Sequence, residues 1–217
     1  MNDPHRGQPV LSRGPAPAAA RLTMIMAHGR GASAEDMLGL AAEFGTTDVA
    51  FLAPQAAGRT WYPNTFLSPI QDNEPWLTSA LGVIAGLVDG LNGRQVPDER
   101  IALIGFSQGA CLSLEFAARH PRRYAAIVGL SGGLIGPPGT PRDYPGALDG
   151  APVFLGCSDI DPHIPLARVQ ESAAVFRRMG ASVDERIYPR MGHTVNADEI
   201  DAVTGLLLSS VRHRSAT

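Results

Sequence analysis

The sequence predicts an α/β fold, in which helices cover both faces of a mostly parallel, twisted sheet. Short apolar runs alternate with longer segments of helical period, and this alternation is typical of parallel strands joined by crossover helices. Most of the short runs are apolar at successive positions, as strands covered on two faces require. The chain has 217 residues, 44% of them hydrophobic, which is enough for one full core and short for two. We therefore expect a single domain over residues 1–217, with 1–21 as a partly irregular lead-in.

Six segments are predicted to be strands, because each is a short apolar run. They span residues 22–28, 49–54, 100–106, 125–131, 151–157 and 183–189. Two other segments are rich in glycine and proline: 13–20 lies in the lead-in, and 132–150 follows the fourth strand. This composition predicts loops, and the second segment leaves no room for a cap domain.

Apolar stripes and end signals predict the helices. One stripe lies within residues 74–93. A second lies within 165–180, where Gly180 provides the stop signal. A last helix is predicted to begin near Asn196, because Asn196 can cap it while the Glu199 side chain reaches back to the cap.

Composition argues against several classes of function. The net charge is −3, and the 18 basic residues, all of them arginine, are spread along the chain. This distribution argues against a nucleic-acid surface or a polybasic membrane anchor. No apolar stretch approaches the length of a membrane span, the first ten residues lack the features of a secretion signal, and two cysteines cannot build a disulfide framework. We expect a cytoplasmic protein.

The stretch 105–109, Gly-Phe-Ser-Gln-Gly, follows a predicted strand and precedes a helical segment. In this context a serine between two glycines is typical of a nucleophile elbow. The glycines allow a sharp, strained turn, which would push the Ser107 hydroxyl out of the sheet edge. The alternative is that Ser107 is only a small residue in an ordinary turn, and the partner residues further along the chain argue against it.

A serine hydroxyl is a poor nucleophile unless a base accepts its proton and a carboxylate orients that base. Both groups follow Ser107 in the sequence. His193 lies in a predicted loop after the last strand, and Asp159 and Asp161 lie just past the end of the preceding strand. The chain order Ser, Asp, His is the one that accompanies this kind of elbow.

Acyl transfer also needs two N–H donors that stabilise the oxygen anion of the intermediate. One is expected to be the backbone N–H of Gln108, aided by the positive end of its helix. The second is expected in the loop after the first predicted strand, where Arg30 lies between Gly29 and Gly31. The backbone N–H of Arg30 is the candidate.

The same loop fits a different pattern. Residues 29–34 match G-x-G-x-x-A between a strand and a helix, which is the fingerprint of a dinucleotide site. That site also needs an acidic residue at the end of the second strand. Here that strand ends in Leu-Ala-Pro-Gln, and Asp48 lies at its other end, so the mismatch argues against a nicotinamide cofactor.

Several motifs together resemble the phospholipase/carboxylesterase family of α/β-hydrolases, which includes the acyl-protein thioesterases. They are HGRGASAEDM (28–37), TWYPNTF (60–66), GFSQGA (105–110), GCSDIDPHIP (156–165) and GHTVN (192–196), and the resemblance runs from about residue 22 to residue 212. The resemblance implies a hydrolase without a cap domain that acts on carboxylic esters. It also implies a triad of Ser107, an aspartate of the 159–161 loop and His193, with the 28–31 loop as half of the oxyanion hole.

The chain departs from the family pattern in two places. The family's acidic loop commonly has glycine, two residues, aspartate and proline, whereas Ile160 and a second aspartate intervene here before Pro162. Counting from Gly156 favours Asp159 as the triad acid, and counting back from Pro162 favours Asp161. We choose Asp159, because a residue nearer the strand end is better fixed by the sheet. Asp161 is then interpreted as a turn or capping residue. The second departure is Arg190, at a position where glycine is expected.

Trp61, Tyr62 and Phe66 follow the second predicted strand. The family comparison makes them, with Gly29, candidate substrate contacts, and the alternative is that the aromatic side chains cover the core. His28 is expected to orient the neighbouring loop by hydrogen bonding. No two histidines have the i, i+4 spacing of a helical zinc site, and neither a metal nor a cofactor is expected.

The sequence thus predicts a serine carboxylesterase that cleaves short to medium acyl esters through an acyl-enzyme. Within the family, the alternative is a thioesterase or lysophospholipase. Outside it, the alternative is a binding or receptor protein on a hydrolase scaffold, with little turnover. The expected partner is a small-molecule ester and not a nucleic acid, and the resemblance implies that two copies of the chain can pair.

Overall fold

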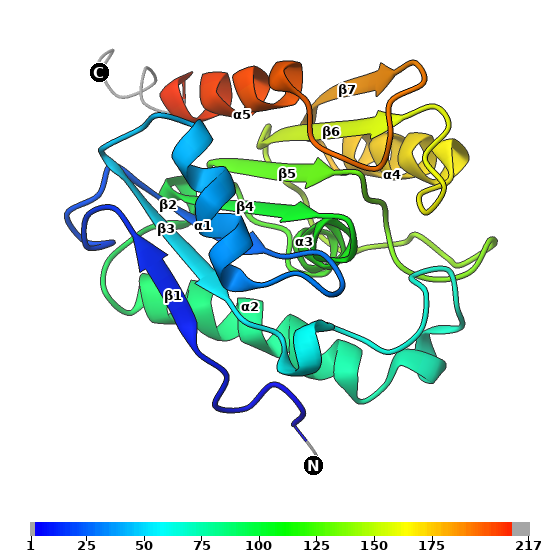
Figure 1. Cartoon of the computed structure of the whole chain (residues 1–217), viewed down its shortest axis with the longest axis horizontal. Coiled ribbons are helices and arrows are strands. Elements are labelled where there is room, and N and C mark those ends of the chain that lie inside the picture. The colour runs from blue at the N-terminus through cyan, green and yellow to red at the C-terminus, as the bar shows by residue number, and fades with distance from the viewer. Residues whose placement is uncertain (1–2, 210–217) are drawn as a thin grey trace.

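The structure is a computed structural model that describes residues 3–209. Its centre is a sheet with strand order β1-β3-β2-β4-β5-β6-β7 (Figure 1). β1 pairs antiparallel with β3, and the other neighbouring pairs are parallel. The strands span Val10–Arg13 (β1), Leu22–Ala27 (β2), Val49–Pro54 (β3), Ile101–Phe106 (β4), Ala126–Leu130 (β5), Pro152–Ser158 (β6) and Ser182–Tyr188 (β7). The predicted α/β class with a mostly parallel sheet is confirmed.

The six predicted strands are confirmed to within one residue at each end. β1 was not predicted, and it lies in the segment that we expected to be irregular. Its register places Val10 opposite Pro54 and Arg13 opposite Phe51. Because β1 is a four-residue edge strand that is mostly exposed, it lacks the apolar run by which the buried strands are recognised.

The described residues contain the helices Ala34–Glu43 (α1), Trp76–Asn92 (α2), Gln108–Arg119 (α3), Leu166–Arg178 (α4) and Ala197–Ser209 (α5). The start of α5 and the end of α4 lie where local sequence signals predict them. At the start of α5, Asn196 Oδ1 accepts the Glu199 N–H and Glu199 Oε2 accepts the Asn196 N–H, both at 2.9 Å, so the predicted reciprocal cap is confirmed. Gly180 follows α4 with a φ of 82°, which confirms the predicted stop. Within 3–209, no helix is both long and apolar enough to cross a membrane.

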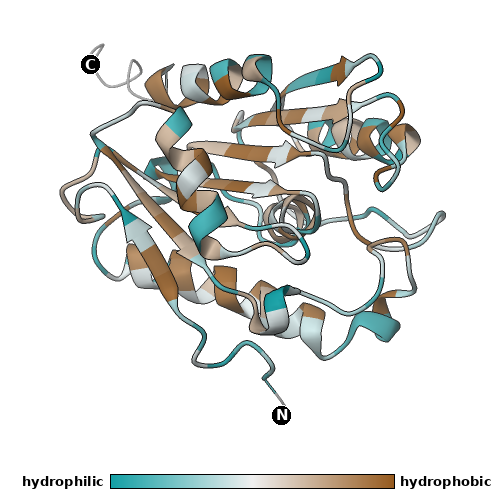
Figure 2. Ribbon diagram, in the orientation of Figure 1, coloured by the Kyte–Doolittle hydropathy of each residue, from teal (hydrophilic) through white to brown (hydrophobic). Residues whose placement is uncertain are grey.

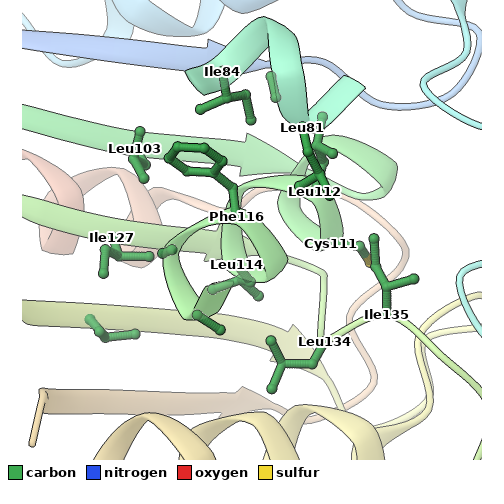
Figure 3. Packing of buried hydrophobic residues seen from close by; sticks show 14 of the residues in the cluster. Leu81, Ile84, Leu103, Cys111, Leu112, Leu114, Phe116, Ile127, Leu134 and Ile135 are labelled. Carbon is green, nitrogen blue, oxygen red and sulfur yellow. The ribbon is translucent and has the colours of Figure 1, made fainter. Parts of the chain in front are cut away.

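The helices cover both faces of the sheet (Figure 1). α2, α3 and α4 pack on one face, where their buried side chains and those of the strands form one apolar cluster. Figure 3 shows part of this cluster, with Phe116 of α3 between Ile84 of α2 and Leu103 of β4. α1 and α5 contribute to a second cluster on the other face. The strands are accordingly hydrophobic along most of their length (Figure 2).

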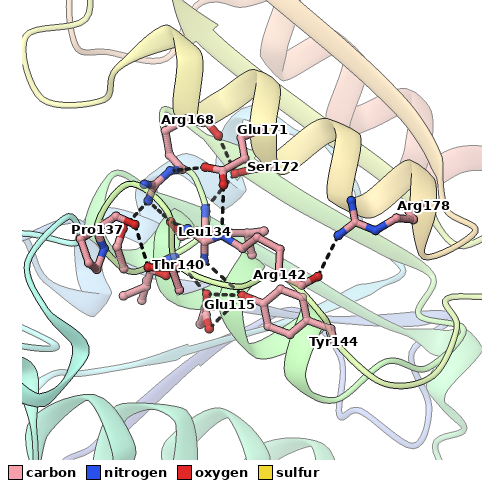
Figure 4. A network of polar contacts seen from close by, with 12 residues as sticks. Glu115, Leu134, Pro137, Thr140, Arg142, Tyr144, Arg168, Glu171, Ser172 and Arg178 are labelled. Carbon is pink, nitrogen blue, oxygen red and sulfur yellow. Dashed lines mark hydrogen bonds and ion pairs between the residues drawn. The ribbon is translucent and has the colours of Figure 1, made fainter.

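The segment between β5 and β6 contains no helix or strand, as its glycine and proline content predicts. Buried polar groups hold its first half against the helices (Figure 4). The Arg168 guanidinium of α4 donates to Leu134 O at 2.7 Å, and the Glu115 carboxylate of α3 accepts the Ile135 N–H at 2.9 Å. The segment is therefore anchored through its backbone, although it has no regular structure of its own.

The strand order brings the predicted site residues to one edge of the sheet. From the neighbours β2 and β4 the chain continues in opposite directions across the sheet, and at such a switch point a crevice opens outside the carboxyl ends of the strands. The loops that follow these ends contain residues 28–33 after β2, Ser107 after β4, 159–161 after β6 and 189–196 after β7.

Candidate active site

Ser107 occupies a strained turn between β4 and α3. Its φ of 55° and ψ of −117° lie in a region that a residue with a side chain adopts at a cost of about 1–3 kcal/mol. The Ser107 N–H donates to Leu130 O at 2.9 Å, and this hydrogen bond ties the turn to the end of β5. The surrounding structure therefore maintains a backbone conformation that the residue alone would not adopt.

Two glycines make this turn sterically possible. A Cβ at Gly105 would lie 2.1 Å from Gly109 O, and a Cβ at Gly109 would lie 2.0 Å from Ala27 O. Both distances are far shorter than any van der Waals contact, so the start of α3 can cross β2 and β4 this closely only with glycine at both positions. The strand–turn–helix geometry predicted for residues 105–109 is present.

Ser107, His193 and Asp161 form a continuous row of hydrogen bonds. His193 Nε2 lies 2.8 Å from Ser107 Oγ, and His193 Nδ1 lies 2.7 Å from Asp161 Oδ2. An ionised carboxylate can only accept, so Nδ1 donates to Asp161 and Nε2 is left to accept the proton of the Ser107 hydroxyl. The sheet edge thus brings together side chains from the loops after β4, β6 and β7.

Asp161 is held as an ionised acceptor. Its side chain is fully buried, and burial by itself would raise the pKa of the carboxyl. The hydrogen bond from His193, together with the N–H groups of His163 and Ile164 on Oδ1 at 2.8 and 3.0 Å, outweighs burial and lowers the pKa of Asp161 below its ordinary value. His193 and the N–H groups of the loop itself therefore supply the charge stabilisation that the carboxylate needs.

The choice of Asp159 as the partner of His193 is wrong. Asp159 Oδ1 instead accepts the backbone N–H of Arg190 at 2.7 Å, and the Asp159 N–H donates to Tyr188 O at 3.2 Å. Asp159 is closer to the end of β6, and this position places its carboxylate beside the start of the β7–α5 loop. Proximity to the strand end was therefore the wrong criterion for choosing the partner of His193. Asp161 is both the turn residue that we expected and the hydrogen-bond partner of His193.

Arg190 has a φ of 55°, which explains why glycine is expected at this position. Such a left-handed backbone costs about 1 kcal/mol in a residue other than glycine or asparagine. The Asp159 carboxylate that accepts the Arg190 N–H stabilises this turn. Asp159 therefore shapes the loop that presents His193, without contacting the imidazole.

The loop after β2 lies against the Ser107 turn. A Cβ at Gly29 would be in ordinary van der Waals contact with Ser107 Cβ, at 3.5 Å, so the two residues are neighbours at this point. Gly29 O accepts His28 Nδ1–H at 2.7 Å and the Ala32 N–H at 3.1 Å. Because the peptide is planar and trans, the Arg30 N–H points away from this carbonyl and from the His28 ring.

His28 is neutral and makes the orienting contact that was predicted. Its Nε2 accepts the Ala56 N–H at 3.1 Å, which leaves the proton on Nδ1 for the bond to Gly29 O. Burial lowers the pKa of His28 below its ordinary value, and a neutral ring is the only form that can both accept and donate here.

Arg30 and Gln108, the predicted oxyanion donors, share a second role that the sequence did not reveal. The Arg30 guanidinium donates to the carbonyls of Tyr62, Pro63 and Asn64 at 2.5–3.0 Å. The Gln108 side chain accepts the Trp61 N–H at 2.9 Å and donates to Tyr62 O at 2.8 Å. Both side chains therefore bind the loop after β3, which forms one wall of the site.

A cavity of about 620 Å³ opens beside Ser107 and His193. Among the predicted substrate contacts, Gly29, Tyr62 and Phe66 line it. Its other lining residues are Arg30, Ala32, Pro63, Asn64, Thr65, Ser68, Phe106, Gln108, Cys111, His163 and Ile164. Apolar and aromatic side chains supply much of this wall, as is usual for small-molecule sites.

Trp61 does not line the cavity, so its prediction as a substrate contact is wrong. The side chain is fully buried, and its indole Nε1–H donates to His28 O at 2.8 Å. The Trp61 side chain therefore helps to hold the loop after β2 in place. For this residue the alternative of core packing is correct.

His163 was not predicted as a site residue, although it lies beside His193. The two rings meet edge to face with centroids 4.8 Å apart, and the Phe106 ring also contacts His193, with centroids 5.0 Å apart. The sequence feature that could have predicted this is the position of His163 two residues after Asp161. The turn whose N–H groups bind the Asp161 carboxylate also brings the His163 side chain close to the His193 imidazole.

The two cysteines are unsuited to nucleophilic attack. Burial raises the pKa of both the Cys111 and the Cys157 thiol to about 12, whereas a reactive cysteine needs a lowered pKa. Cys157 Sγ lies 3.9 Å from Asp161 Oδ2, which is a weak contact. Within 3–209, no group of three histidine, cysteine or acidic residues is arranged to hold a metal ion.

Comparisons with known proteins agree with this architecture. A family model described as Phospholipase/Carboxylesterase matches residues 14–209. The chain is 32% identical over 166 residues to NocK of Nocardia uniformis subsp. tsuyamanensis, whose name describes an esterase, and this match covers 73% of the chain and 44% of NocK. It is 34% identical over 112 residues to acyl-protein thioesterase 1 of Gibberella zeae, covering 50% of the chain and 47% of that protein. The chain thus spans less than half the length of each of these two relatives.

Among solved structures, a phospholipase/carboxylesterase from Dyadobacter fermentans superposes with a TM-score of 0.89 at 38% identity, over 93% of this chain and 97% of that one. The resemblance drawn from the sequence motifs is therefore confirmed by a match over nearly the whole chain. The chain belongs to the phospholipase/carboxylesterase family of α/β-hydrolases.

Proposed function

We propose that the protein is a serine carboxylesterase that cleaves short to medium acyl esters by way of an acyl-enzyme. The observation that supports this most directly is the row Ser107 Oγ, His193 Nε2, His193 Nδ1 and Asp161 Oδ2, with successive contacts of 2.8 and 2.7 Å. A nucleophile, a general base and a group that orients the base are each in hydrogen-bond reach of the next.

In this mechanism Ser107 Oγ attacks the ester carbonyl while His193 Nε2 accepts the hydroxyl proton. Asp161 remains ionised and stabilises the imidazolium through Nδ1. The C–O bond to the alcohol then breaks, and His193 returns its proton to the departing oxygen. Water, activated by the same imidazole, attacks the acyl-enzyme and releases the carboxylic acid and free Ser107.

The negative charge on the carbonyl oxygen needs donors that are in place before reaction. The Gln108 N–H belongs to the first turn of α3, where the backbone donors have no partner within the helix, and the helix dipole favours an anion there. The Arg30 N–H is directed away from His28 by the hydrogen bonds at Gly29 O. Each such donor contributes about 2.7–4 kcal/mol to stabilising a transition state of this type.

A thioesterase or lysophospholipase activity is the second candidate. The names of the fungal relatives favour acyl thioesters, and the same mechanism hydrolyses both kinds of bond. The apolar lining from Tyr62, Phe66, Phe106 and Ile164 suits an acyl chain in either case. A receptor with little turnover is less well supported, because the hydrogen-bonded row of Ser107, His193 and Asp161 is the arrangement that nucleophilic catalysis requires.

The decisive experiment compares the wild type with Ser107→Ala. The wild type should turn over aryl esters many times and react with a serine-directed phosphonate, whereas the variant should do neither while remaining folded. A single burst without further turnover would support the receptor alternative. A series of aryl esters and matching thioesters, from acetyl to decanoyl, should then show an acyl-length optimum and which bond is preferred. Phosphonate labelling of the variant at the wild-type rate would refute the assignment of Ser107.

A further inference from the structure

The N-terminal segment reaches the back of the candidate active site. β1 joins the edge of the sheet, the Gln55 N–H donates to Pro9 O at 2.9 Å, and the chain before it carries His5 into the interior. The His5 side chain lies behind the loop after β3 and is only 2% exposed. Its backbone N–H donates to Ser79 Oγ of α2 at 3.0 Å, which anchors the segment on the helix.

The His5 imidazole binds both ends of one turn in that loop. Its Nδ1 accepts the Ala57 N–H at 3.1 Å, and its Nε2 lies 3.0 Å from Trp61 O. An amide N–H can only donate and a carbonyl can only accept, so the ring is neutral with its proton on Nε2. The ring also contacts two indoles, with centroids 5.5 Å from Trp61 and 5.4 Å from Trp76.

The turn that His5 holds connects the two halves of the candidate oxyanion hole. On one side, Arg59 O accepts the Gly31 N–H at 2.8 Å, which ties the turn to the loop of Arg30. On the other side, the Trp61 N–H donates to the Gln108 side chain at 2.9 Å. The Gln108 backbone N–H is held by α3 and by the Ser107 turn, whose N–H donates to Leu130 O, so a displacement of the 57–62 turn moves the Arg30 loop relative to it and changes the spacing of the two donors.

We propose that His5 is a positioning residue for ester hydrolysis: from outside the cavity, its neutral imidazole fixes the 57–62 turn and thereby the spacing of the Arg30 and Gln108 N–H groups. The inference rests on the function proposed above. It assigns a role to the lead-in segment, which the sequence motifs did not include. His5 does not line the cavity, so it acts only through the loop.

The surroundings of His5 keep its ring neutral. Burial lowers the pKa of His5, and the Trp61 carbonyl and the Asp3 carboxylate oppose that effect in part. Among residues 3–209, the His28 ring also interacts with His5, while α2 presents the uncharged Trp76 and Ser79. A proton added to Nδ1 would face the Ala57 N–H, so acidification breaks the contact that holds the turn.

The kinetic test compares His5→Ala with His5→Gln. Alanine removes both hydrogen bonds, and kcat for an aryl ester should fall about ten- to a hundredfold, because small displacements of catalytic groups have effects of this size. KM should change less than about twofold, since His5 does not contact substrate. Glutamine offers one acceptor and one donor, and it should recover most of the lost kcat. His120→Ala, a histidine replacement at the far end of α3, should leave kcat unchanged.

A spectroscopic test reports on the same ring. The chain has two tryptophans, both of which pack against His5, and a protonated imidazole quenches indole fluorescence. Acidification should quench the wild type more than His5→Gln, and subtracting the two curves removes the contribution of His28. The ratio of wild-type kcat to His5→Gln kcat should fall through the same pH range as this difference.

Wild-type kcat in a folded His5→Ala, or equal losses in His5→Ala and His5→Gln, would overturn the proposal. If His5→Ala does not fold, the glutamine variant decides: a kcat ratio that stays constant while the fluorescence difference titrates would also overturn it. These outcomes leave the proposed function intact as long as the wild type hydrolyses esters and is labelled at Ser107. A wild type that does neither refutes the proposed function itself.

Discussion

Asp159 and Asp161 lie in the same loop but have different roles. Asp161 holds His193 in the tautomer that leaves Nε2 free to accept a proton, and Asp159 stabilises the left-handed turn at Arg190 from which the His193 loop continues. The contact of Asp161 determines the tautomer of the imidazole, whereas the contact of Asp159 determines only the conformation of the loop around it. Substitution by asparagine separates these tasks, since it keeps the shape and removes the charge.

Asp161→Asn should lower kcat by about four orders of magnitude, the size of effect known when the acid of a serine triad becomes an amide. The amide can present its N–H group to Nδ1 and favour the wrong imidazole tautomer. Asp159→Asn should lower kcat less than about tenfold, because its carbonyl oxygen still accepts the Arg190 N–H. Steady-state hydrolysis of one aryl ester by both variants provides the measurement. A greater loss for Asp159→Asn than for Asp161→Asn would contradict this division of roles.

Glu199 couples the stability of the fold to pH. Its side chain is fully buried, and burial raises the pKa of the carboxyl to about 7 from the ordinary 4.5. A raised acid pKa means that the folded state binds the proton more tightly than the unfolded chain, so the contribution of Glu199 to stability is full below about pH 4.5 and is lost as pH rises through about 7. The full effect is on the order of 3 kcal/mol.

Glu199→Gln should therefore gain stability relative to the wild type between pH 5 and pH 8, on the order of 3 kcal/mol at most. The glutamine carbonyl can still accept the Asn196 N–H that caps α5. Urea unfolding of both proteins across this pH range gives the difference directly. Parallel pH curves for the two proteins would show that Glu199 does not titrate in this range.

At the scale of elements, the crossing of α3 over β2 and β4 is the least tolerant contact in the site. A Cβ at Gly109 would overlap Ala27 O, whereas a Cβ at Gly205 of α5 would meet nothing within 4 Å. The two glycines are both helical, and only the first has a backbone neighbour. Gly109 and Gly205 form a matched pair for testing why glycine occurs at a helical position, because only at Gly109 does a neighbouring backbone approach closely.

Gly109→Ala should destabilise the fold by more than about 3 kcal/mol, in the range of strongly disruptive core changes, and abolish activity, since α3 has to move away from the strands. Gly205→Ala should stabilise it by about 0.5–1 kcal/mol, because alanine is the better helix former and the site is exposed. Thermal and urea unfolding would measure both changes. A Gly109→Ala protein as stable and active as the wild type would mean that the crossing can widen without consequence.

For the whole molecule, the sequence predicted those features that depend on the pattern of neighbouring residues in the chain. The buried strands, the elbow around Ser107 and the cap at Asn196 each depend on residues close in the chain. The choice between Asp159 and Asp161 depended instead on where the β7–α5 loop lies in space, and Trp61 could not be placed without knowing what covers it. The role of His5 was not predicted, because its hydrogen-bond partners lie more than fifty residues away in the sequence. Hydrophobic periodicity does not indicate contacts of this kind.

The anchored segment after β5 links the far helix α4 to the cavity wall. Arg168 donates to Leu134 O and Gly136 O at 2.7 and 2.6 Å, the Gly136 N–H donates to Phe66 O at 2.7 Å, and the Arg168 guanidinium lies 5.8 Å from the centre of the Phe66 ring. The buried Arg168 guanidinium thus holds the segment through Leu134 (Figure 4) and also contacts Phe66, an aromatic residue that lines the site.

Arg168→Met keeps the packing of the side-chain stem and removes the donors, so two buried carbonyls lose hydrogen bonds at a cost of about 1–3 kcal/mol each. The variant should unfold at lower urea concentration, be cleaved faster by protease within residues 134–146, and show a raised KM for the longer acyl esters that reach Phe66. Arg177→Met on the same helix is the control, because its side chain is 49% exposed and pairs with Glu185 at the surface, an interaction worth about 0–1 kcal/mol. Equal cleavage rates and equal KM values for the two variants would mean that the segment after β5 is held by its apolar contacts and not by Arg168.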